Sequence, residues 1–62
     1  MSPHDPVANP DALAPRGKSA EGDYVRGYAR CLRKANGVDE SAAVLRALSV
    51  VADDLDAGLH RA

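Results

Sequence analysis

The sequence predicts an all-α fold, in which an antiparallel two-helix hairpin follows an extended, proline-rich N-terminal arm and is completed by dimerisation or by a partner protein. Three observations predict it. All four prolines lie within residues 1–18, two later segments carry apolar residues at steps of three and four, and only two or three residues separate those segments. The chain therefore divides into an arm, residues 1–18, and a helical hairpin, residues 19–62.

The arm is expected to be extended or disordered. Proline fixes φ and biases the residue before it away from helix, and the stretch MSPHDPVANPDALAPRGK offers almost nothing to bury. The simplest interpretation is a solvated tail. The alternative is an arm that lies on a partner protein.

The first helix is predicted over about residues 21–36. Ser19 is the expected N-cap, two acids occupy the first turn, and Gly37 follows the last residue. At about 100° per residue, the apolar side chains share one arc and the cations share the opposite one. We therefore expect Cys31 to face inward and the cations to face solvent. The apolar arc consists of Tyr24, Val25, Tyr28, Cys31, Leu32 and Ala35, and the basic face consists of Arg26, Arg30, Arg33 and Lys34.

The second helix is predicted over about residues 39–60, with Asp39 as its N-cap. A turn this short folds two helices back on each other. Two amphipathic helices leave an apolar side open, so we expect a second copy of the chain or a larger protein to cover it. The apolar stripe consists of Val44, Leu45, Leu48, Val51, Ala52, Leu55 and Leu59.

Length and composition exclude several classes of function. A chain of 62 residues forms one domain at most, without room for a catalytic cleft, and its net charge of −1 does not favour nucleic-acid binding. One cysteine and two histidines cannot make a zinc site. No apolar run suits a membrane span or a signal peptide, so we expect a cytoplasmic protein. The prediction is therefore no catalytic residue, metal, cofactor, membrane association or small-molecule substrate.

These observations predict a small non-enzymatic protein–protein interaction module, such as an accessory, adaptor or regulatory subunit. It would dock through the apolar faces of the hairpin, because aromatic and large aliphatic side chains carry most contact energy. The cations of the basic face would set orientation and partner choice rather than affinity. The expected anchors are Tyr24, Tyr28, Leu32, Leu48, Val51 and Leu55.

A second hypothesis comes from the stretch LRKANGVDESAAVLRAL, residues 32–48. It resembles the helix, glycine-containing turn and second helix of ribbon-helix-helix repressors, small dimers that include many antitoxins. The resemblance implies a dimeric DNA-binding repressor in which Arg16, Lys18 and Ala20, on a strand before the first helix, enter the major groove. The positions between them, which anchor the strand with apolar residues in that family, are Gly17, Ser19 and Glu21 here. A strand at residues 15–21 would favour this hypothesis, and a coil would favour the docking module.

Overall fold

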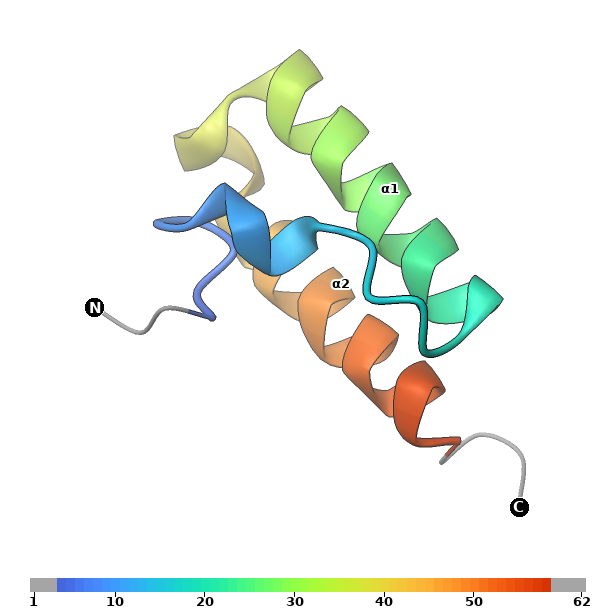
Figure 1. Cartoon of the computed structure of the whole chain (residues 1–62). Coiled ribbons are helices and arrows are strands. Elements are labelled where there is room, and N and C mark those ends of the chain that lie inside the picture. Colours follow the sequence, from blue (N-terminus) through green and yellow to red (C-terminus); the bar gives the residue numbers. More distant parts are fainter. Residues whose placement is uncertain (1–3, 59–62) are drawn as a thin grey trace.

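The structure is a computed structural model that describes residues 4–58. Its elements, in chain order, are the 3-10 helix η1, Pro10–Leu13, and the α-helices α1, Ala20–Asn36, and α2, Val38–Ala57. The two α-helices run antiparallel and pack along their length (Figure 1). Residues 4–58 contain no strand. The predicted all-α helical hairpin is confirmed.

Local signals explain where α1 begins and ends. The Ser19 hydroxyl accepts a hydrogen bond from the Gly22 N–H at 2.9 Å, which satisfies one of the free donors of the first turn. At the other end, the Gly37 N–H donates to the Arg33 carbonyl at 3.0 Å. Arg33 and Lys34 in the last turn complement the negative end of the helix dipole.

The reversal between the helices takes one residue, Gly37, rather than the expected two or three. Its φ of +80° is readily available only to glycine, and it lets α2 begin directly at Val38. The prediction of Asp39 as N-cap is wrong, because this residue already lies in the first turn of α2 and no side chain caps that turn. The buried Ser41 hydroxyl instead donates to the Gly37 carbonyl at 2.5 Å.

The helix α2 ends where Gly58 adopts a left-handed conformation with φ of +74°. The predicted end near residue 60 falls on Leu59 and His60, which lie outside the described residues. Within the described part of the chain, no helix is long and apolar enough to cross a membrane.

The core contains a residue of the arm. Leu13, Ala29 and Leu45 are fully buried in one cluster, with Val7 and Leu48 packed against it. This corrects the expectation that residues 1–18 have almost nothing to bury. The physical reason is local, since η1 starts with Pro10 at a favourable first position and the Asn9 side chain accepts from the Asp11 N–H at 3.1 Å.

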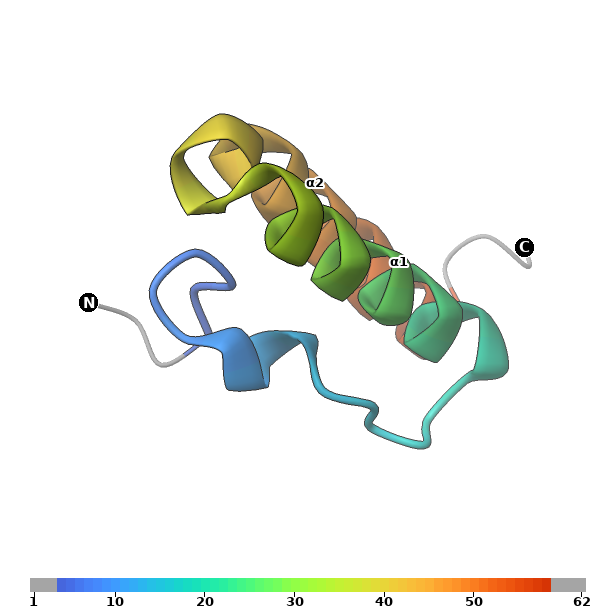
Figure 2. The same ribbon diagram turned by 90° about the horizontal axis from the view of Figure 1, so that it is seen from above.

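The arm covers only one side of the hairpin. The view from above, in which α1 lies in front of α2, shows the arm on one side of the two helices and no described segment on the other (Figure 2). Two polar contacts fasten it, from Arg30 of α1 to the Leu13 carbonyl and from Arg46 of α2 to Asp5 at 3.9 Å. The hairpin thus has a covered side and an open side.

Candidate functional site

The buried charge of the molecule is Arg26, which lies between the two helices with 1% of its surface exposed. Its guanidinium donates to Asp23 at 3.0 Å, to Asp53 at 2.9 Å and to Asp56. A buried cation is tolerated when carboxylates neutralise it and accept its hydrogen bonds. We call Arg26 and its three aspartates the arginine junction.

The arginine junction also holds the segment before α1. The Asp23 carboxylate accepts from the backbone N–H groups of Arg16 and Gly17, both at 2.9 Å. These two bonds, aided by Arg26, hold the pKa of Asp23 below its ordinary value of 3.8. Three parts of the chain therefore meet at one set of charges.

Asp56 completes the junction on α2. Hydrogen bonds from Arg26 and then from the Ser19 hydroxyl, the latter at 2.7 Å, lower the pKa of Asp56 below 3.8. The pKa of the Arg26 guanidinium is raised, and the hydrogen bond to Asp56 is the largest cause. Two aspartates of α2, Asp53 and Asp56, are thus partners of Arg26.

The predicted basic face is therefore divided. Arg26 does not face solvent, because it belongs to the arginine junction, and this part of the prediction is wrong. Arg30 and Lys34 are exposed and Arg33 is half-buried. The inward-facing positions of α1 are instead Gly22, Arg26 and Ala29. Gly22 and Ala29 are too small to count in an apolar stripe, yet their size lets the helices approach closely.

The remaining three cations lie beside the arm. Arg30, Arg33 and Lys34 line a cavity of about 330 Å³ together with Pro10 and Leu13. The Nε atom of Arg33 is buried and has no hydrogen-bond partner among the described residues. An unsatisfied buried donor costs about 1–3 kcal/mol, and more when it is charged. We call this cavity the basic cavity.

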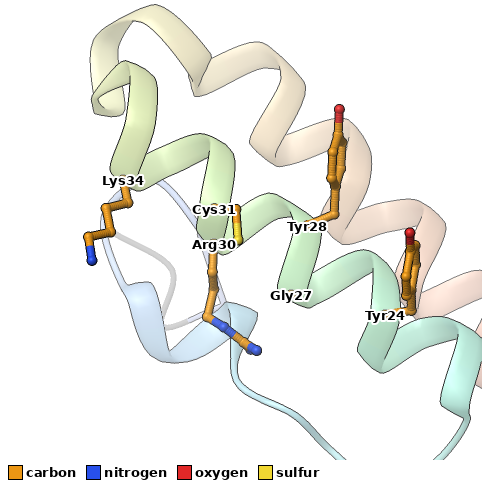
Figure 3. A pocket seen from close by; sticks show the side chains of 6 residues that line it. All are labelled: Tyr24, Gly27, Tyr28, Arg30, Cys31 and Lys34. Atoms are coloured by element: carbon orange, nitrogen blue, oxygen red, sulfur yellow. The ribbon is translucent and has the colours of Figure 1, made fainter.

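A shallow groove runs over the outer surface of α1 (Figure 3). Tyr24 and Tyr28 point to one side of the helix, and Arg30 points the other way, toward the arm. Cys31 lies between the tyrosines and Arg30 and is exposed, so the prediction that it faces inward is wrong. The tyrosines expected on the inward arc are exposed as well, because the small residues and Arg26 occupy the contact with α2.

On the side of the hairpin away from the arm, apolar side chains of both helices meet. At one end Tyr24 and Val25 lie beside Leu55, and at the other Leu32 lies beside Val44. Helical spacing places the others between these ends. We call this surface the open face: Tyr24, Val25, Tyr28, Leu32, Val44, Leu48, Val51 and Leu55. It contains all six predicted anchors, and four of its members are exposed by 77% (Tyr24), 54% (Tyr28), 47% (Val44) and 41% (Val51).

Comparisons with protein-family models, with curated proteins and with solved structures give no match for this chain.

The spacing of apolar residues did not predict two features, the burial of Leu13 and the burial of Arg26. Leu13 could have been found from Asn-Pro-Asp at residues 9–11, a capped helix start followed by a leucine. The neighbours of Arg26 in the sequence do not predict its burial, because two of its three partners, Asp53 and Asp56, lie 27 and 30 residues away. The open face, in contrast, follows from the spacing of the apolar residues.

Proposed function

We propose that this chain is a small non-enzymatic protein–protein interaction module that docks through its open face. The observation that carries the proposal is the exposure of Tyr24, Tyr28, Val44 and Val51 on the side of the hairpin that the arm leaves uncovered. Exposed apolar surface of this kind typically marks an interaction site. Tyrosine is also enriched among the residues that dominate binding energy.

The occupant that the geometry favours is a second copy of the chain. Two antiparallel hairpins that join by their apolar faces form a four-helix bundle, and two-fold pairs are the commonest oligomers. The exposed parts of the four side chains amount to on the order of 400 Å², about half of the ~800 Å² that each partner buries in a standard interface. The half-buried leucines and the rim would supply the rest. A larger protein with a helical surface is the other occupant.

Matched valine variants on α2 test this proposal. Val51 belongs to the open face, whereas Val50 is 60% exposed and lies outside it. In sedimentation equilibrium we expect the parent chain at twice its 6.5 kDa, Val51→Asp as a monomer, and Val50→Asp as a dimer like the parent. Circular dichroism should show the same helix content for all three proteins.

A monomeric parent chain would reject the second copy as occupant. The module then requires a host protein that is captured by the parent and by Val50→Asp but not by Val51→Asp. If capture did not distinguish the two valines, or if both variants dissociated the dimer alike, docking through the open face would be wrong.

The alternative function, a ribbon-helix-helix repressor, finds less support. Residues 14–19 are coil, and Gly17 has a φ of +70°, which a strand residue does not adopt. Two N–H groups that a paired strand would need, those of Arg16 and Gly17, are already bound by Asp23. Sequence-selective DNA binding tighter than about 1 μM at ~0.15 M salt would overturn the docking module in favour of the repressor.

A further inference from the structure

The basic cavity is a second surface, separate from the open face, with its own chemistry. Its walls come from η1 and from the C-terminal half of α1, and its volume of about 330 Å³ is near the lower end of the range for ligand pockets. Pro10 and Leu13 supply an apolar wall, and the opposite wall consists of cations. The size suits a small ligand rather than a nucleotide or a peptide segment.

The charge of the basic cavity is not neutralised within the described chain. The ion pairs of residues 4–58 join Arg26 to three aspartates and Arg46 to Asp5, and none of them joins Arg30, Arg33 or Lys34 to a carboxylate. The helix dipole favours Arg33 and Lys34 in the last turn of α1. It does not account for Arg30 one turn earlier, or for the unpaired Nε donor of Arg33.

The donors of the cavity match the oxygens of a phosphate group. A guanidinium presents its N–H groups as a planar fork that fits phosphate, and a lysine ammonium adds a compact charge. Arg30 uses its Nη1 atom to hold the Leu13 carbonyl, which fixes the wall formed by the arm. Arg33 lines the same cavity with its half-buried guanidinium side chain, and Lys34 is exposed there.

We propose that the basic cavity binds a small phosphate-bearing anion, either inorganic phosphate or a soluble phosphate monoester. Both ligands offer the same dianionic group to Arg30, Arg33 and Lys34. Binding would hold η1 against α1, because the ligand would contact residues of both elements. The proposal does not depend on the open face or on its occupant.

The test is a titration of the full chain with inorganic phosphate at constant ionic strength, monitored by ¹H–¹⁵N correlation spectra. We expect shifts confined to residues 10–14 and 30–34, with a dissociation constant of about 1 mM or tighter. The double variant Arg33→Gln with Lys34→Gln should weaken binding by about tenfold or more. The control Arg16→Gln with Lys18→Gln makes the same change in net charge at exposed side chains outside the basic cavity and should leave binding unchanged.

A single variant keeps the proposal testable if the double variant does not fold. Lys34→Gln alters one exposed side chain, so the fold should persist and the affinity should fall by about threefold, a change of ~0.65 kcal/mol by the usual conversion. Scattered shifts, equal shifts in sodium chloride alone, or equal weakening by the control pair would overturn the proposal.

Further titrations distinguish the possible sources of a phosphate group. Glycerol phosphate, a soluble monoester, should compete for the same resonances as inorganic phosphate. Vesicles of phosphatidylcholine that contain phosphatidic acid test a lipid headgroup instead. Binding to these vesicles without binding to either soluble anion would overturn the proposal, as would no binding to any of the three.

Discussion

Gly22 is buried where α1 lies against α2. A methyl group at this position would collide with Asp56, would lie 2.6 Å from the Ser19 hydroxyl oxygen, and would lie 3.0 Å from the backbone oxygen of Ala52. The last contact involves backbone, so relief requires the two helices to separate. The glycine in the first turn of α1 is thus explained by space and not by flexibility.

The first prediction compares two glycines of α1. Gly22→Ala should lower the free energy of unfolding by about 1–3 kcal/mol, because it overfills a packed contact. Gly27→Ala is the control, since the added methyl group meets only the end of Arg30 at 3.5 Å. It should stabilise the chain by about 0.5–1 kcal/mol through helix propensity. Urea denaturation measures both, and an equal effect of the two changes would contradict the close contact at Gly22.

Arg26 is the residue on which the arginine junction depends. The second prediction is that Arg26→Met lowers the free energy of unfolding by about 1–3 kcal/mol, because it leaves three carboxylates without their cation. This loss of unfolding free energy is smaller than the loss expected from breaking a fully buried ion pair, because Asp53 is 58% exposed and water screens its charge.

The control for Arg26 is another arginine that pairs with an aspartate. Arg46 is 59% exposed and lies 3.9 Å from Asp5, so Arg46→Met should change the free energy of unfolding by no more than about 0.5 kcal/mol. Thermal denaturation followed by circular dichroism compares the two variants. A smaller loss for Arg26→Met than for Arg46→Met would show that the junction does not stabilise the fold.

At the scale of the element, η1 acts as the third wall of the core. This single turn is too short to be stable alone, and it persists because Asn9 caps it and Leu13 is buried between Ala29 and Leu45. Its role is larger than its length, because the hairpin contributes few large buried side chains. The arm is therefore part of the folded unit.

The third prediction concerns this turn. Leu13→Ala should cost about 2–5 kcal/mol, which lowers the thermal midpoint of so small a domain by about 10 °C or more. Leu13→Met keeps the volume and should cost less than about 1.5 kcal/mol. A midpoint for Leu13→Ala within 2–3 °C of the parent would mean that the arm only lies on the surface. If Leu13→Ala is unfolded in buffer, titration with a stabilising osmolyte restores the comparison.

At the scale of the whole molecule, the arm and both helices form one body. The radius of gyration is 11.1 Å, close to the ~10.6 Å expected for a compact chain of this length. Two kinds of contact hold the arm side together, the apolar cluster around Leu13 and the arginine junction. Of the open face, Leu48 also packs against the apolar cluster.

The fourth prediction is the acid sensitivity of the whole fold. The pKa values of Asp23 and Asp56 are lowered in the folded state, so the unfolded chain takes up protons first as the pH falls. The stabilisation from these groups is fully present above about pH 5 and is lost below the ordinary value of 3.8, toward the folded pKa values. The urea concentration at the unfolding midpoint should therefore not change through these two groups between pH 7 and about pH 5. It should fall between about pH 5 and pH 2.

A variant of the junction identifies the source of the acid sensitivity. Asp56→Asn should be less stable than the parent at pH 7 and should lose less stability between pH 5 and pH 2. Asp54→Asn, on the same helix but outside the junction, should retain the full acid loss of the parent. If the two variants followed the same pH curve, the acid sensitivity would come from other carboxylates.

The sequence by itself determined the features that depend on neighbouring residues. Two helices, the Ser19 cap, the chain reversal at Gly37 and a stripe of apolar residues on each helix all follow from spacing and capping. These interactions act within about one helical turn, so a local pattern contains their cause. The open face belongs to this class, because its members repeat at helical steps.

Only the tertiary structure decided which face of α1 turns toward α2. Hydrophobicity favours the tyrosines, but the contact is made by Gly22, Arg26 and Ala29. The deciding interactions come from Asp53 and Asp56, about 30 residues away in the chain, and from the room that a glycine leaves for a neighbouring helix. Burying an arginine is unfavourable until such partners are in place, and only the folded chain brings them together.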